Sequence, residues 1–96
     1  MAFGRLLEEK GIPVKKLVVF GSYAKNQATI NSDIDLCVVS SEFGKDPIDE
    51  MQFLVKQTPK IDTMIEPYPF SPQGYNELEN PLVLEIRKYG KEINRV

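Results

Sequence analysis

The sequence predicts an α/β fold: a small mixed β-sheet of three to four strands, flanked by helices. Short apolar runs with the length and β-branched content of strands occupy residues 17–20 and 33–39. Apolar residues at helical spacing lie on either side of these runs, at residues 3–11, 47–57 and 81–89. Because 96 residues are enough for one modest core, we expect a single domain over residues 1–96.

The first part of the chain predicts one helix and two strands. Residues 3–11 form the helix, which a glycine and a proline end. The run Leu17–Phe20 is apolar throughout, which is typical of a central strand covered on both faces. A helical turn over residues 22–27 and a loop through residue 32 then lead to the second strand, Asp33–Val39.

The middle of the chain predicts a helix followed by a third strand. Asp46 is a candidate N-cap for a helix over residues 47–57, with an apolar stripe of Ile48, Met51, Phe53, Leu54 and Val55. The segment Lys60–Pro67 alternates in character and is expected to be the third strand. In that strand Asp62 and Glu66 would share a face.

The last part of the chain predicts an irregular connection, a helix and a short strand. Three prolines in Pro67–Pro72 indicate an extended segment without regular structure. Pro81 opens the last helix, which runs to Gly90, and residues 91–96 are expected to add a terminal strand.

Composition excludes several classes of function. A net charge of −2 argues against nucleic acid as the main partner, because nucleic-acid binders usually neutralise many phosphates. The chain has no histidine, so carboxylates are the available acid–base and metal-binding groups. The single cysteine, Cys37, lies in an apolar run and is expected to be a buried hydrophobe. No apolar run approaches a membrane span, and the N-terminal residues do not resemble a signal peptide, so we expect a cytoplasmic protein.

Two aspartates at the start of the second predicted strand are the main functional signal. Side chains two residues apart in a strand share a face, so Asp33 and Asp35 would repel each other. A bound divalent cation, most often Mg²⁺, offsets such repulsion. Gly21 and Ser22 end the preceding strand, where backbone N–H groups and a hydroxyl can hold phosphate oxygens. Metal ligands beside a phosphate site indicate nucleotide chemistry.

The stretch GSYAKNQATINSDIDLCVV resembles the signature of the DNA polymerase β-type nucleotidyltransferase superfamily, in which Gly-Ser, a spacer and Asp-x-Asp follow one another. The short chain and its ending NPLVLEIRKYGKEI are similar to the minimal nucleotidyltransferase (MNT) branch of that superfamily. The resemblance covers nearly the whole chain and implies a nucleotidyltransferase fold.

The resemblance also implies a site. Asp33 and Asp35 would ligate one or two Mg²⁺ ions, with a third carboxylate from the next strand. Asp62 matches that position best and Glu66 is the alternative. Gly21, Ser22 and Lys25 correspond to the family's triphosphate-binding positions. The family often has glycine where this chain has Asn26, a residue that tolerates the left-handed backbone of such a turn.

The reaction implied by this resemblance is transfer of a nucleoside monophosphate, expected to be AMP from ATP, to an acceptor hydroxyl. In the MNT branch the acceptor is expected on a partner such as a helical HEPN-type toxin, with this chain as the antitoxin, a protein adenylyltransferase. The alternative is a nucleotide-binding module with little or no catalysis that neutralises a toxin by contact. Exposed aromatic residues would offer a docking or homodimer face, the candidates being Tyr68, Phe70, Tyr75 and Tyr89.

Overall fold

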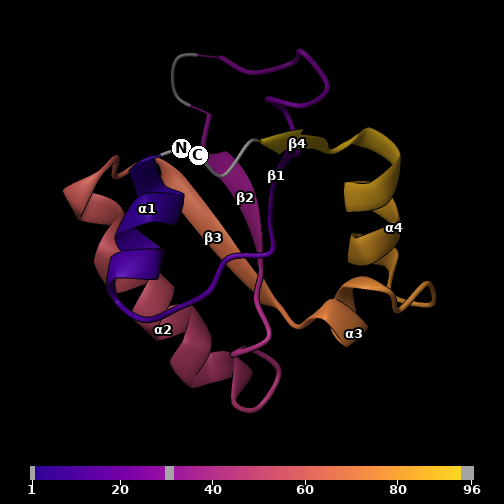
Figure 1. Cartoon of the computed structure of the whole chain (residues 1–96). Helices are drawn as coiled ribbons and strands as arrows, with labels where there is room; N and C mark the ends of the chain where they lie inside the picture. Colours follow the sequence, from indigo (N-terminus) through magenta and orange to yellow (C-terminus); the bar gives the residue numbers. More distant parts are fainter. Residues whose placement is uncertain (1, 30–31, 94–96) are drawn as a thin grey trace.

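Three layers make up the fold in this computed structural model, which describes residues 2–29 and 32–93. A four-stranded sheet forms the middle layer (Figure 1). Helices α1 (Ala2–Glu9) and α2 (Pro47–Gln57) cover one face, and α3 (Pro72–Tyr75) and α4 (Pro81–Tyr89) cover the other. The strands are β1 (Lys16–Phe20), β2 (Ile34–Val39), β3 (Ile65–Phe70) and β4 (Lys91–Ile93). None of the helices in the described ranges is long and apolar enough to cross a membrane.

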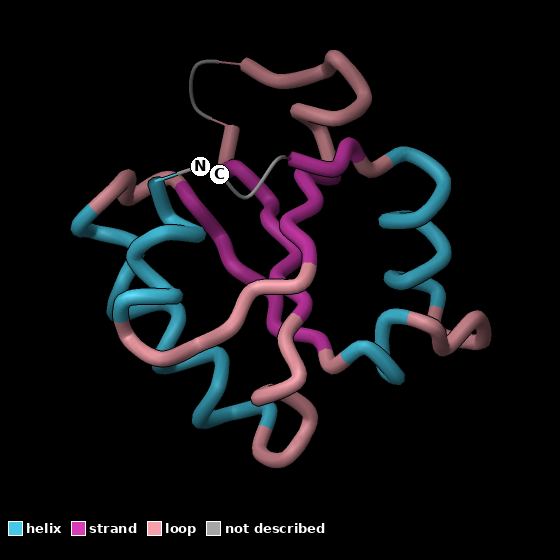
Figure 2. The backbone as a smooth tube through the Cα atoms, viewed as in Figure 1, coloured by secondary structure: helices cyan, strands magenta, loops and turns pink. Residues whose placement is uncertain are grey.

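The sheet is mixed, as expected, with the strand order β3-β2-β1-β4. β1 runs antiparallel to both β2 and β4, whereas β2 and β3 are parallel and are joined through α2. The backbone tube in Figure 2 shows β1 and β2 together in the middle of the molecule. The predicted central position of residues 17–20 is therefore confirmed, and the long connection from β1 to β2 lies at one end of the sheet.

Two hydrophobic clusters, one on each face of the sheet, hold the layers together. The cluster under α1 and α2 takes alternate residues of β1 and β2, among them Leu17, Leu36 and Val38. The cluster under α3 and α4 takes the residues between them, including Val18, Phe20 and Cys37. Burial raises the pKa of the Cys37 thiol to about 12, so the expectation of a buried hydrophobe is confirmed.

Helix α2 begins and ends at the predicted residues, but its predicted apolar stripe is partly wrong. The Asp46 side chain accepts a hydrogen bond from the backbone N–H of Asp49 and caps the helix as expected. Leu54 is buried, whereas Ile48 is 71% exposed and Val55 is 49% exposed. These two residues lie seven apart on the solvent side of the helix, because α2 packs against the sheet through one face only.

The third strand begins five residues later than predicted. Residues 58–60 form a 3₁₀ turn after α2, and the chain becomes a strand only at Ile65. Asp62 terminates that turn, since its backbone N–H donates to the Thr58 carbonyl (2.7 Å) and its Oδ1 accepts from the N–H of Met64 (2.8 Å). The prediction that Asp62 and Glu66 share one strand face is therefore wrong.

The proline-rich segment, predicted to be irregular, is the body of β3. β3 is an edge strand. The carbonyl of Met64 accepts from the N–H of Ile34, the first residue of β2, and the carbonyl of Phe70 accepts from the N–H of Ser40, which follows β2. In a parallel strand, alternate residues point their backbone polar groups to the same side. Pro67 and Pro69 therefore face away from β2, where no N–H is needed.

The terminal strand is confirmed in its described part. β4 covers Lys91–Ile93 and pairs with β1, and the remainder of the predicted segment, residues 94–96, lies outside the described residues. The predicted loop over residues 28–32 includes residues 30 and 31, which also lie outside them. Asn80 caps α4 by accepting from the N–H of Leu82.

Candidate active site

The sheet register places two carboxylates side by side. Asp35 of β2 is paired with Phe20 of β1 on one side and with Glu66 of β3 on the other. Paired residues on neighbouring strands point to the same face, so Asp35 and Glu66 both lie on the face that α3 and α4 cover. Glu66, the alternative third carboxylate, is therefore the one beside Asp35.

Asp35 lies near other carboxylates, and their negative charge affects its pKa. Its pKa is raised by burial, and then by the negative charges of Glu66, Asp33 and Glu85. Asp33 precedes β2 and is exposed, and Asp62 is exposed in the turn before β3. Within residues 2–29 and 32–93 no three acidic or cysteine side chains are grouped so that they could hold a metal ion as they stand.

Gly21 makes room for the Asp35 carboxylate. It has a φ of 72°, in the left-handed region that favours glycine. A Cβ at this position would lie 2.2 Å from Asp35 Oδ2, so a side chain there would displace the Asp35 carboxylate. The glycine of the Gly-Ser pair therefore serves both the turn at the end of β1 and the approach of a carboxylate oxygen.

Tyr68 contacts both Glu66 and the hydrophobic core. Its hydroxyl donates to Glu66 Oε1 at 3.0 Å, and its ring meets Phe20 edge to face with centroids 5.2 Å apart. Burial, together with the hydrogen bond and charge of Glu66 and the charges of Asp35 and Asp33, raises the pKa of Tyr68 to about 12. The phenol therefore stays protonated and acts as a hydrogen-bond donor near neutral pH.

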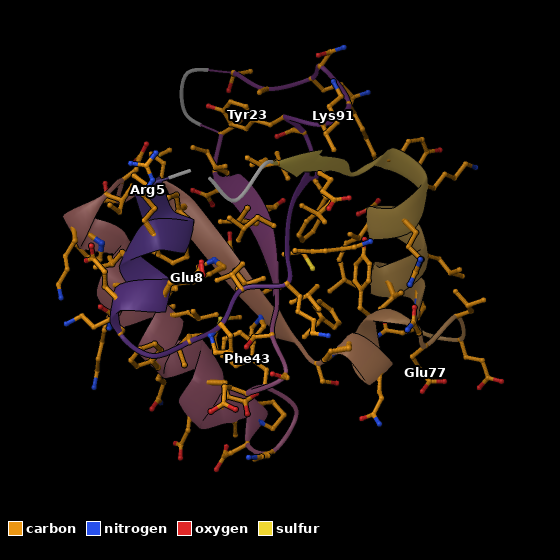
Figure 3. The ribbon with its side chains drawn as sticks, in the orientation of Figure 1. Arg5, Glu8, Tyr23, Phe43, Glu77 and Lys91 are labelled. Carbon is orange, nitrogen blue, oxygen red and sulfur yellow. The ribbon has the colours of Figure 1, made fainter. Side chains whose placement is uncertain are left out.

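The segment after Gly21 forms a turn rather than a regular helix. The carbonyl of Gly21 accepts from Lys25 N (3.2 Å) and that of Ser22 accepts from Gln27 N (2.8 Å), which confirms a helical turn as expected. Across the described part of the chain, no acceptor is found for the N–H groups of Ser22, Tyr23 and Ala24. Tyr23 marks this turn at the end of the sheet in Figure 3. Successive free N–H groups of this kind suit an anion.

Lys25 is directed toward α4. Its Nζ lies 3.0 Å from Glu85 Oε1 and 4.7 Å from the centroid of the Tyr89 ring. Lys25, Gln27 and Tyr89 line an open cavity of about 420 Å³. Glu85, the ion-pair partner of Lys25, also contributes to the raised pKa of Asp35.

Two site neighbours, Glu85 and Tyr68, were not expected from the sequence. Glu85 reaches the site only because α4 packs back onto β1, which no local pattern signals. Tyr68 was expected among the aromatic residues of a docking or homodimer face, not as a partner of a site carboxylate. Of the four aromatic residues considered for docking, Tyr75 is only 8% exposed, which excludes it, and Tyr89 is 43% exposed.

Comparisons with known proteins identify the family and the fold. Residues 3–94 match the profile of a family described as nucleotidyltransferase domain. No curated protein matches the sequence. A crystal structure of a toxin-antitoxin with AMP-PNP has a TM-score of 0.62 at 21% identity, covering 96% of this chain and 72% of that one. A toxin-antitoxin MntA-HpeT mutant has a TM-score of 0.58 at 19% identity, covering 96% and 71%. These likenesses show a shared fold, and the family match shows that this chain belongs to the nucleotidyltransferase domain family.

Proposed function

We propose that this nucleotidyltransferase transfers AMP from ATP to a hydroxyl group of a partner protein, using one or two Mg²⁺ ions. The observation that carries the proposal is the row formed by Asp35 and Glu66, with Asp33 at its edge and Gly21 packed against Asp35. Oxygen donors of this kind suit a hard divalent cation. We propose Asp33, Asp35 and Glu66 as the ligands, with Asp62 as the rival for the third position.

The reaction forms a bond between the acceptor oxygen and the α-phosphorus and breaks the bond from that phosphorus to the oxygen bridging to the β-phosphate, so pyrophosphate leaves. The proton of the acceptor hydroxyl is released to water or to a site carboxylate. Bound Mg²⁺ would supply charge stabilisation and lower the pKa of the acceptor hydroxyl. The residues of the chain contribute placement, since strand pairing fixes the backbone positions of Asp35 and Glu66. Phosphoryl transfer depends on positioning and electrostatics, so it suits a site in which the metal supplies charge and the protein supplies placement.

The turn after β1 is the proposed site for the triphosphate. The N–H groups of Ser22, Tyr23 and Ala24, free of acceptors among the described residues, are available to phosphate oxygens. The Lys25 ammonium forms an ion pair with Glu85. We propose that its flexible stem lets the ammonium exchange Glu85 for a phosphate when ATP binds.

The proposed partner is a toxin. Two solved structures of the same fold are toxin-antitoxin proteins, and one of them contains AMP-PNP, an ATP analogue. The other carries glutamate in place of two aspartates that are two residues apart, the spacing of Asp33 and Asp35 here. We propose that residues 1–96 act as a single minimal nucleotidyltransferase domain in the cytoplasm, with a HEPN-type toxin as acceptor. A homodimer is a further proposed assembly.

A mass measurement tests this proposal. The chain is incubated with ATP, Mg²⁺ and the protein that co-purifies with it, and intact masses are recorded. We expect the partner to gain one or more AMP units, and we expect the gain to vanish when EDTA is added or Asp35 is replaced by asparagine. If the partner binds tightly but is never modified, the chain neutralises it by contact alone. The open arrangement of the carboxylates would then reflect an inactive site.

A further inference from the structure

Tyr68 holds one oxygen of the carboxylate that we place third in the metal site. Glu66 and Tyr68 are two residues apart on β3 and so project from the same face. The Tyr68 hydroxyl donates to Glu66 Oε1 at 3.0 Å. An ionised carboxylate has two acceptor oxygens, so while Oε1 accepts from Tyr68, Oε2 can contact a cation.

The position of the Tyr68 ring is fixed by the core. Phe20, against which the ring packs edge to face at 5.2 Å, is only 3% exposed and pairs with Asp35 across the sheet. Phe20 also precedes Gly21, whose Cα leaves space for the Asp35 carboxylate. The hydroxyl of Tyr68 is therefore held relative to the same backbone that places Asp35.

Glu66 needs such a restraint. It is exposed on an edge strand, where a glutamate side chain samples several rotamers. Holding the side chain in one rotamer therefore costs conformational entropy. We propose that Tyr68 is a positioning residue that pre-orients Glu66 for metal binding through its hydroxyl. This inference rests on the proposed metal site and assigns a role that packing of the ring alone does not supply.

Mn²⁺ titration of the full chain without nucleotide tests the inference, because it reads metal affinity rather than turnover. Tyr68→Phe removes only the hydroxyl, and Tyr75→Phe is the matched control. Tyr75 belongs to the same core cluster, and its ring meets that of Phe70 edge to face. Since outer-shell partners of metal ligands typically contribute 10-fold to 100-fold in affinity, we expect Tyr68→Phe to bind Mn²⁺ about 10-fold more weakly and Tyr75→Phe to bind normally.

A double mutant separates positioning from packing. In a Glu66→Gln background, adding Tyr68→Phe should change Mn²⁺ affinity by less than about twofold, because the hydroxyl acts through the carboxylate. Equal Mn²⁺ affinity in Tyr68→Phe and the wild type would overturn the role of Tyr68 while leaving the metal site in place. Absence of Mn²⁺ binding in the wild type would overturn both the site and the inference.

Discussion

Gly21 combines two demands that a matched pair of substitutions can separate. Gly11 has a similar φ, 90°, but a Cβ there would have nothing within 4 Å. Gly11→Ala and Gly21→Ala should each lose about 1 to 2 kcal/mol of stability through the left-handed backbone. Only Gly21→Ala also places a methyl group 2.2 Å from Asp35 Oδ2, so only that variant should lose nucleotide transfer. Chemical denaturation and a pyrophosphate-release assay measure the two effects. Normal activity in a folded Gly21→Ala protein would contradict the proposed site.

Asp35 should be essential for transfer and dispensable for folding. Its burial and its three acidic neighbours disfavour the charged form, so Asp35→Asn should leave melting without metal unchanged or raise it. Metal ligands contribute several kcal/mol to the transition state, so activity should fall about 100-fold or more. Asp33→Asn should behave in the same way. As a control, Glu77→Gln changes an exposed carboxylate in the α3–α4 connection (Figure 3) and should alter neither property. A large loss of stability in both aspartate variants would make these residues structural.

The raised pKa of Asp35 also predicts a pH dependence of stability. The folded protein holds this proton more tightly than the unfolded chain, whose pKa is near 3.8. The free energy of unfolding from this group is therefore highest below that value and falls as the pH rises through the folded-state pKa. Asp35→Asn cannot titrate, so its melting temperature minus that of the wild type, without metal, should increase from about pH 3 to pH 7. A constant difference would mean that the Asp35 pKa is not raised.

At the scale of the elements, the start of β3 favours Glu66 over Asp62 as the proposed third ligand. The strand begins at Ile65, so Glu66 is in register with Asp35, and Asp62 is left in the preceding turn. Glu66→Gln should therefore reduce transfer by about 100-fold or more. Asp62→Asn keeps an oxygen for the Met64 N–H and should remain near the wild type in activity. Steady-state rates at saturating Mg²⁺ compare the two, and the reverse order would restore Asp62 to the site.

The same elements show what sequence patterns were able to predict. β1 and β2 have continuous or alternating apolar residues, so their bounds and the shared face of Leu36 and Val38 followed from periodicity. The bounds of β3 could not be predicted in this way, because Pro67 and Pro69 argue against a strand unless that strand is known to lie at an edge. Edge position depends on the order of the whole sheet, which local patterns do not contain. The expectation that Asp62 rather than Glu66 supplies the third carboxylate depended on the same unknown position of β3.

At the scale of the whole molecule, the two hydrophobic clusters share one sheet and should unfold together. Leu54 lies in one cluster and Ile86 in the other, and both are essentially buried. Truncating either to alanine should cost about 2 to 5 kcal/mol. Because β1 and β2 contribute residues to both clusters, each variant should shift one cooperative transition, observed equally by circular dichroism and by tyrosine fluorescence. Two separate transitions would show that the layers are independent.

The outward-facing prolines of β3 have a consequence for self-association. A strand that approached this edge would find no N–H to accept from at Pro67 or Pro69, so sheet extension and amyloid-like stacking are blocked on that side. The opposite edge, β4, has three described residues, Lys91–Ile93, and two of them are charged. Both edges therefore resist further strand pairing. A protein that shields its sheet in this way leaves its helices and its connecting loops as the surfaces through which other molecules meet it.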